Sequence, residues 1–458
     1  MTALAKTAPA TDAVTSAAAR LADPVPWRIV NRRLLAKSIG ELSYEEVFQP
    51  VEAGVEAGVE AGVEVGARGG RTRFELRLAG GVTYAFEGWR RIWGQISVDP
   101  DSVYRRVGDL SAPAEDCLQF FLDARAELGA DASTLCTYLK ELSSTLAADA
   151  RIISANAGMT ADELIDLAPD RLQCRLDGHP KAPASKGRIG WGLEDQVAFA
   201  PEYEAPFRLV WIAASRGHCR FALADGLDQE ELLHQSMDAA ERTRLRAACR
   251  AAGTDEAHYI LLPVHPWQWT NMVVPYVAGE IAARRIVHLG RFGDAYLAQQ
   301  SLRTLANADR PGRMHVKLPL TILNTSCWRG IPGRYMSAGP RLSRWLSSIA
   351  REDRVLADAG TLVLEEVAGA FYPNPAYEQV ADAPYQFHEM LGAIWRESVE
   401  RHLPRGQTGV MMGALLQCDG HGRPLASAWI ERSGLGHEVW LEKLFEAVVV
   451  PLYHFMCR

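Results

Sequence analysis

Apolar residues along the chain follow different spacings, and each spacing predicts a different kind of element. Between residues 71 and 89 they alternate with polar residues on both sides of Gly80-Gly81, which predicts a β-hairpin. From 112 to 157 they recur every three or four positions, which predicts a pair of packed helices. Between about 170 and 335, short apolar runs such as "FRLVWIAA", "HYILLPVHPWQW" and "KLPLTIL" predict strands.

Helical spacing returns after residue 340, in "PRLSRWLSSIA" and "YQFHEMLGAIWRESVERHL". The order of the patterns predicts an α+β fold. We expect a disordered Ala/Thr-rich tail over 1–25, a helical N-terminal region over 26–165, a β-rich central region over 166–345, and a second helix-containing region over 346–458. The repeat "VEAGVEAGVEAGVEVG" at 51–66 has Gly at every fourth place, so we interpret it as a surface insertion.

Composition narrows the class of protein. The chain has 458 residues and 48% hydrophobic content, enough for a large core. Its net charge of −7 argues against a nucleic-acid binder or a basic membrane-surface protein. No stretch reaches the roughly 20 apolar residues that span a bilayer, and the N-terminus lacks the apolar core of a signal peptide. Eight scattered cysteines are typical of reduced thiols. We therefore expect a cytoplasmic protein without nucleic-acid or membrane partners.

One glycine-rich segment has the composition of a ligand-binding loop. It is "DGHPKAPASKGRIGW", residues 177–191. Its glycines let backbone amides approach a ligand, and Lys186 and Arg188 supply positive charge for phosphate or carboxylate oxygens. A solvated basic turn is the alternative. Further along, His265 at a strand end is either a ligand contact or a structural histidine beside Trp267.

A second segment concentrates positive charge. From Ser301 to Tyr335 there are six Arg and Lys residues against one acid, Asp309, in a chain that is acidic overall. A polyanionic ligand would explain this excess. Thr325 and Ser326 beside Arg329 would orient a carboxylate, and the alternative is a Ser/Thr turn with Arg329 in a surface ion pair. The sequence has no common nucleotide loop, nucleophile elbow or metal-ligand spacing.

In this order, "GHPKAPASKGRIGW", "LLPVHPWQW", "SLRTL", "HVKLPLTILNTSCWRGIP" and "GVMMGALLQCDGHGRPLASAWIERSG" resemble the IucA/IucC family. These are siderophore synthetases that work without a nonribosomal peptide template, and the resemblance is greatest to the aerobactin-synthase-like branch. It covers roughly residues 110 to 458. The resemblance implies a cupped hand, with a thumb at 26–165, sheet-containing fingers at 166–345 and a partial palm at 346–458.

The resemblance also implies a reaction. ATP, with Mg²⁺, converts a citrate carboxyl into an acyl-adenylate, which an amine or hydroxylamine then attacks. It places three residues at the ATP phosphates, Ser301, Arg303 and Lys317, and it adds Gly178 and Lys186 in the neighbouring loop. It places four residues at citrate and the adenylate: His179, Thr325, Ser326 and Arg329. Of these, His179 and Arg329 are the catalytic pair. Arg188 is a weaker candidate for contact with either ligand, and His265 is interpreted as structural. No residue is assigned to a metal ion. The resemblance also allows a homodimer.

Two departures from the family pattern affect this expectation. Where many members have a second His-Pro, this chain has Ala182-Pro183. The chain also ends at "PLYHFMCR", inside a segment that in relatives leads into further site residues, and its apolar stripe from Trp440 to Met456 has no polar cap. We therefore expect a truncated synthetase or a partner chain that covers the stripe. The alternatives are an inactive fragment or binding partner that retains part of a citrate/ATP pocket, and an unrelated anion-binding scaffold.

Overall fold

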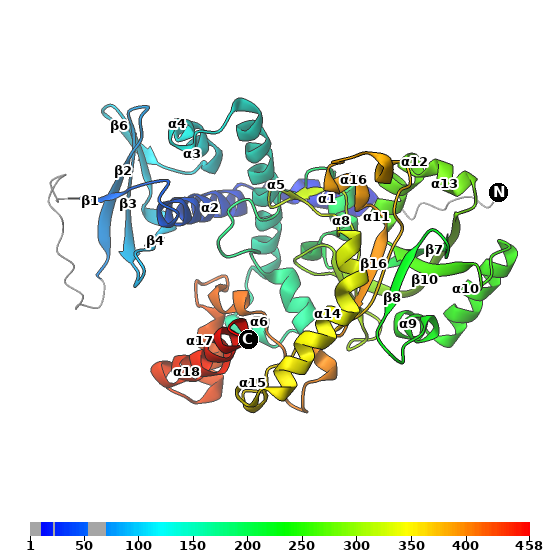
Figure 1. The fold of residues 1–458 in the computed structure, drawn as a ribbon. Coiled ribbons are helices and arrows are strands. Elements are labelled where there is room, and N and C mark those ends of the chain that lie inside the picture. Colours follow the sequence, from blue (N-terminus) through cyan, green and yellow to red (C-terminus); the bar gives the residue numbers. More distant parts are fainter. Residues whose placement is uncertain (1–10, 22, 54–69) are drawn as a thin grey trace.

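The computed structural model describes residues 11–21, 23–53 and 70–458. Figure 1 shows an N-terminal sheet, a larger central sheet, and helices of the C-terminal residues beside them. The long helix α5 (Ala132–Asn156) runs between the two sheets. Both sheets are covered by helices from the same chain, so the predicted α+β class is confirmed.

The N-terminal sheet is antiparallel and contains the predicted hairpin. Its strands lie in the order β1-β2-β3-β5-β6, with β4 paired to β3. Their bounds are β1 Val51–Glu52, β2 Thr72–Arg77, β3 Val82–Arg90, β4 Ile96–Val98, β5 Tyr104–Val107 and β6 Leu110–Pro113. Strands β2 and β3 pair from Thr72–Gly88 to Arg77–Thr83 around the Gly80-Gly81 turn. The predicted 51–66 insertion lies mostly outside the described residues.

Helices from two parts of the chain cover one face of this sheet. They are α2 (Pro24–Tyr44), α3 (Cys117–Asp123), α4 (Arg125–Leu128) and α5. The predicted helices of 112–157 are confirmed, and the Asp116 and Asp131 carboxylates cap α3 and α5 by accepting backbone N–H bonds. Leu35 of α2, Phe86 of β3 and Leu142 of α5 meet in one core.

The expected disordered tail is wrong for residues 11–21. They form helix α1 (Thr11–Leu21), which contacts α5 and α8 (Leu193–Phe199). Ala17 is buried there. Alanine is the strongest helix former, so an Ala-rich segment becomes ordered once another element covers one of its faces.

The central sheet has eight antiparallel strands in the order β8-β15-β16-β12-β11-β10-β7-β9. Their bounds are β7 Phe207–Ser215, β8 Arg220–Leu223, β9 Tyr259–Val264, β10 Ile286–Ala298, β11 Thr304–Asn307, β12 His315–Lys317, β15 Glu366–Phe371 and β16 Gly392–Arg396. The strands predicted at "FRLVWIAA" and "HYILLPV" are β7 and β9. The strand expected through "KLPLTIL" stops at Lys317, because Pro319 has no N–H to donate to a neighbouring strand.

The helix expected over "YQFHEMLGAIWRESVERHL" is wrong. Only the short helix α16 (Tyr385–His388) and a 3-10 turn (Val399–Arg401) are helical, and 392–396 is the strand β16 between β15 and β12. Ala393, Ile394 and Trp395 are all buried, because a central strand is covered on both faces. The division of the chain at residue 345 stays a prediction, and the sheet takes strands from both sides of it.

Helices flank the central sheet on both faces. They are α9 Gln229–Ser236, α10 Ala239–Ala251, α11 Pro266–Gln268, α12 Val274–Tyr276, α13 Ala278–Ala282, α14 Gly333–Glu352 and α15 Arg354–Asp358. The helix predicted at "PRLSRWLSSIA" is α14. It packs directly on β15, where a Cβ on Gly369 would lie 1.8 Å from the Met336 carbonyl oxygen.

The C-terminal residues form helices that pack partly against an earlier segment. Helices α6 (Ala161–Ile165) and α7 (Pro169–Leu172) share a small core with α17 (Leu425–Ser433). The chain continues through α18 (His437–Leu444), a π-helical turn (Phe445–Val449) and α19 (Val450–Met456). Leu441, Phe445 and Leu452 are exposed there. No helix in the described ranges is long and apolar enough to cross a membrane.

Candidate functional site

The ends of four neighbouring strands bring cations from distant parts of the sequence together. Lys317 of β12 lies opposite Thr304 of β11, and Arg396 of β16 lies opposite both His315 of β12 and Glu366 of β15. Directly opposed residues in an antiparallel sheet share a face, as do residues two apart on one strand. Lys317 and Arg396 therefore project from the same face of the central sheet.

The charges on this face are only partly compensated. Burial lowers the pKa of Lys317, and the neighbouring Arg303 and Arg396 lower it further, against the opposing effect of Glu366. Burial likewise lowers the pKa of Arg396. The Arg396 Nε atom is buried and has no hydrogen-bond partner within the described residues. Phosphate or carboxylate oxygens would supply the missing acceptor and charge, so the donor set fits an anion.

A tight turn between β10 and β11 carries Ser301 and Arg303. The turn is held by Leu302, whose side chain is buried and whose φ is 62°. The Ser301 hydroxyl accepts a 3.1 Å bond from the Thr304 N–H, and the Arg303 guanidinium donates to the Gly330 carbonyl. The Arg303 carbonyl accepts a 2.8 Å bond from the Leu318 N–H. This bond ties the turn to the end of the strand that carries Lys317.

Thr325 and Ser326 occupy a strained two-residue turn. They join β13 (Leu323–Asn324) to β14 (Cys327–Trp328) with φ values of 49° and 56°. Such backbone costs about 1–3 kcal/mol per non-glycine residue and persists only where other contacts hold it. Here the Glu141 carboxylate accepts from both the N–H of Ser326 (3.0 Å) and its hydroxyl (3.3 Å). Burial raises the pKa of Glu141, while Ser326 and the nearby Arg329 oppose that rise.

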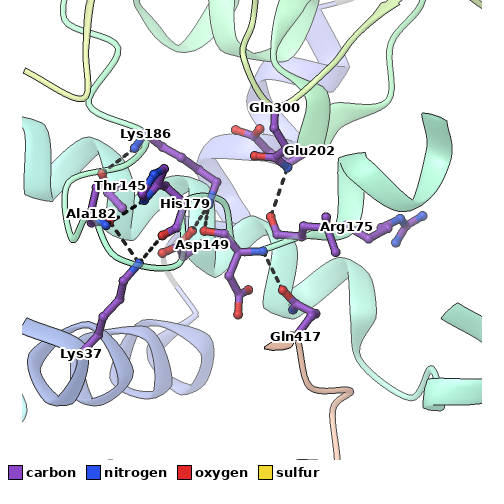
Figure 2. A network of polar contacts seen from close by, with 12 residues as sticks. Lys37, Thr145, Asp149, Arg175, His179, Ala182, Lys186, Glu202, Gln300 and Gln417 are labelled. Atoms are coloured by element: carbon purple, nitrogen blue, oxygen red, sulfur yellow. Dashed lines mark hydrogen bonds and ion pairs between the residues drawn. The ribbon is translucent and has the colours of Figure 1, made fainter. Parts of the chain in front are cut away.

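The predicted glycine-rich loop lies across α2 and α5 (Figure 2). His179 is exposed, and its Nδ1 accepts from the backbone N–H groups of Lys181 (3.2 Å) and Ala182 (3.0 Å), so Nε2 carries the ring proton. Gly178 has φ 92°, and a Cβ there would lie 3.0 Å from the Lys186 Nζ. Glycine is needed both for this backbone conformation and for space.

Lys186 is not exposed to solvent. It is 2% exposed, and its Nζ donates a 2.6 Å bond to the Asp149 carboxylate and a further bond to the Asp177 carbonyl (Figure 2). Burial raises the pKa of Asp149, against the opposing effect of Lys186. In this structure the ammonium of Lys186 therefore holds the loop onto α5.

Arg188 and His265 are buried and have protein partners. The Arg188 guanidinium forms a bidentate ion pair with the Glu202 carboxylate. The contact between Nη2 of Arg188 and Oε2 of Glu202 is 2.9 Å. His265 is 1% exposed, and its Nδ1 accepts from the Trp267 N–H as the N-cap of α11. Burial lowers the pKa of His265 to about 3. These contacts agree with a structural part for both residues.

Hydrogen bonds connect the glycine-rich loop to the segments that carry the strand-end cations. The Gln300 amide, next to Ser301, donates to the carbonyls of Gln173 and Leu176 just before the loop (Figure 2). At the other end of the loop, the Arg188 N–H donates to Asn324 at 3.3 Å, and Ile189 pairs with Leu323. The structure thus places the predicted site residues on three connected segments: 178–186, 301–317 and 325–329.

Sequence reasoning missed several charged residues around this site. Glu366, Glu389 and Arg396 all lie beyond residue 345, in segments read as helical or not assigned. Burial raises the pKa of Glu389 to about 7, with Arg303 and Arg334 opposing the rise. Its side chain lies against Gly330, where a Cβ would come within 2.3 Å of a Glu389 carboxylate oxygen. The useful signal was an arginine directly after the apolar run "GAIW".

Within the described part of the chain, no three His, Cys, Asp or Glu side chains form a group that could hold a metal ion. The fold and the strand-end cations define an α+β protein whose central sheet gathers donors that suit an anion. Its particular class follows from comparison with known proteins. The chain belongs to the IucA/IucC family, whose model matches residues 170–417.

Individual relatives agree with this family. The chain is 41% identical to aerobactin synthase of Escherichia coli over 94% of its length and 70% of the relative's. It is 37% identical to the rhizobactin siderophore biosynthesis protein RhbF of Rhizobium meliloti, over 94% of its length and 69% of the relative's. The structure matches that of aerobactin synthetase IucC from Klebsiella pneumoniae with a TM-score of 0.81 at 38% identity, covering 94% of this chain and 72% of the other. The expected family, fold and siderophore-synthetase class are confirmed.

Proposed function

We propose that this chain is a siderophore-biosynthesis ligase that joins a citrate carboxyl to an amine or hydroxylamine at the expense of ATP. The observation that carries the proposal is the convergence of Arg303, Lys317 and Arg396 at the strand ends, in a chain 41% identical to an aerobactin synthase. A carboxylate does not acylate an amine at neutral pH, so it has to be activated first. Adenylation supplies that activation.

In the proposed first step a citrate carboxylate oxygen attacks the α-phosphorus of ATP. A new C–O–P linkage forms, and pyrophosphate leaves with the bonding electron pair. We assign Ser301, Arg303 and Lys317 to the phosphates. Gly178 and Lys186 shape the neighbouring loop. These cations offset the negative charge that ATP and citrate bring together, which is electrostatic stabilisation and positioning.

We assign Thr325, Ser326, Arg329 and His179 to citrate and the adenylate. Ser326 and Arg329 lie beside the same Glu141 carboxylate. The exposed Nε2–H of His179 is available as a donor to an oxyanion. In the second step the neutral amine attacks the acyl carbon, AMP leaves with the C–O electron pair, and the amine loses a proton.

We propose that Mg²⁺ arrives bound to the ATP phosphates, because triphosphate oxygens are its usual ligands. We also propose a cytoplasmic location and a homodimer, and the homodimer is what the resemblance to the family implies. All eight cysteines are free thiols in the structure, which agrees with a reducing compartment. Light scattering on the purified chain tests the dimer.

The test is pyrophosphate release by the purified chain with ATP, Mg²⁺, citrate and hydroxylamine. Release should depend on citrate. Lys317→Gln should lower kcat/KM for ATP about tenfold to 100-fold, because a hydrogen bond to a charged group contributes about 1.5–3 kcal/mol. Lys140→Gln, an exposed lysine on α5, is the matched control and should not change the rate. Saturable citrate binding without release would instead favour the inactive binding partner.

A further inference from the structure

One buried carboxyl group lies beside the strand-end cations and has no part in the two steps assigned so far. The Glu389 side chain follows helix α16 directly and is 3% exposed. Among residues 11–21, 23–53 and 70–458, its carboxylate forms no hydrogen bond or ion pair. Buried carboxyls are ordinarily paired, so this group needs an explanation other than a structural ion pair.

Packing fixes the position of this carboxyl on two sides. A Cβ on Gly330 would overlap the Glu389 carboxylate, so the side chain lies directly on the backbone of Gly330. The next residue along the chain is Met390, whose carbonyl accepts a 2.9 Å bond from the buried Gln268 amide. A group held in this way is already positioned for proton transfer, which requires a defined geometry.

Gly330 lies between the two sets of residues that we assign to the ligands. Its carbonyl accepts a bond from the Arg303 guanidinium, and Arg329 precedes it in the chain. We assign Arg303 to the ATP phosphates and Arg329 to citrate and the adenylate. The bond between the phosphate and the acyl carbon has to lie between these two sets, and therefore beside Glu389.

The charges around Glu389 suit a group that gains and loses a proton. Burial raises its pKa to about 7, and the two charged groups that oppose the rise are Arg303, in the turn before β11, and Arg334, in the first turn of α14. Both protonation states are therefore populated at neutral pH. Departure of pyrophosphate removes negative charge from the site, which favours the ionised carboxylate when the amine attacks.

We propose that Glu389 is the general base of the second step. The amine lone pair forms the new C–N bond, an N–H proton passes to a Glu389 carboxylate oxygen, and the C–O bond breaks with its electron pair going to AMP. Glu389 then returns the proton to solvent. This inference rests on the proposed function and adds a catalytic residue to its second step.

The test compares the two steps in the purified chain. Exchange of labelled pyrophosphate into ATP, with Mg²⁺ and citrate but no amine, reports on adenylation. Hydroxamate formation with hydroxylamine reports on both steps. Glu389→Gln should lower hydroxamate formation about 100-fold, within the usual contribution of a general base, and this fall should exceed any fall in exchange at least tenfold.

The pH profile is a second measurement, which a purely structural part for Glu389 would not alter. In the parent chain, hydroxamate formation should accelerate as pH rises through about 7, because the base acts only when ionised. Glu389→Gln should remove this inflection, and Glu389→Asp, which keeps a carboxylate, should retain it at a reduced rate. Titration of hydroxylamine itself is common to all the chains. Glu378→Gln, at an exposed position, is the matched control and should follow the parent in both assays.

The outcomes separate this inference from the proposed function. An equal fall of exchange and hydroxamate formation in Glu389→Gln would overturn the inference, since Glu389 would then act on adenylation through Arg303. Persistence of the inflection in Glu389→Gln would also overturn it. Absence of citrate-dependent exchange in the parent chain would instead contradict the proposed ligase, and the inference with it.

Discussion

Glu389 shows how a single buried carboxyl makes stability depend on pH. Burial raises its pKa to about 7, from an ordinary value of 4.5. Because the folded-state pKa is the higher one, the stabilisation from protonated Glu389 is complete below about pH 4.5 and is lost as pH rises through 7. Glu389→Gln keeps a neutral side chain at every pH. Its thermal midpoint should therefore rise relative to the parent chain between pH 5 and pH 8.

The control for this prediction is Glu378→Gln, at an exposed position in the same region. Its midpoint should follow that of the parent chain at each pH. A Glu389→Gln curve that also stays parallel to the parent between pH 5 and 8 would show that Glu389 is already ionised at pH 5.

Individual site residues were predictable where the sequence itself concentrates them. Ser301, Arg303 and Lys317 lie within seventeen residues, so the local excess of cations was visible without a structure. Arg396 and Glu366 join them only through strand pairing, since Arg396 lies opposite His315. No local pattern encodes that register, which depends on how eight strands from distant segments order themselves in the sheet.

At the scale of elements, Gly369 lets helix α14 pack on strand β15. A Cβ at this position would lie 1.8 Å from the Met336 carbonyl oxygen, a backbone atom of the helix. Gly369→Ala would therefore force α14 away from the sheet. We expect the free energy of unfolding in urea to fall by about 1–3 kcal/mol, the usual cost of overpacking.

Gly217→Ala is the matched control, because a Cβ there meets no atom within 4 Å. It should unfold at the same urea concentration as the parent chain. A Gly369→Ala protein of unchanged stability would mean that α14 can shift along β15 without losing contacts.

Elements with one exposed face were predicted well, and elements covered on both faces were predicted only in part: β7 and β9 were expected as strands, and β16 was not. The β2–β3 hairpin and helix α5 alternate buried and exposed residues with a clear period. Strand β16 is buried on both faces, so its apolar residues are consecutive and, with Phe387 and Leu391, imitate helical spacing. Helix α1 was missed for another reason: its order comes from contact with α5 and α8, which composition does not reveal.

At the scale of the whole molecule, the chain divides its apolar residues among separate cores. One core lies in the central sheet and another between the N-terminal sheet and its helices. A third, smaller core joins residues 161–176 to residues 414–428, which are far apart in sequence. Residues of this segment also hold the start of the glycine-rich loop, because Gln417 accepts a hydrogen bond from the backbone N–H of Asp177.

Asp419 links the two halves of the third core. It is 3% exposed, and its carboxylate accepts 2.9 Å bonds from the N–H groups of Ala161, His421 and Arg423. Asp419→Ala would leave the buried Ala161 N–H without a partner, at a cost of about 1–3 kcal/mol, and would also remove the acceptor of the two partly buried N–H groups. Amide hydrogen exchange should therefore accelerate at least tenfold in 161–176 and 414–428 together, while β7 and β9 stay unchanged.

Asp162→Asn is the control, because it removes a nearby surface ion pair and leaves the buried contacts of Asp419 in place. Asp162 is half exposed and forms a 2.6 Å ion pair with Arg423, and such pairs contribute little in solvent. Its exchange pattern should match that of the parent chain. If Asp419→Ala accelerated exchange only in 417–423, the two segments would be held together by apolar contacts alone. If exchange accelerated throughout the central sheet, the third core would unfold with the whole molecule rather than as a unit of its own.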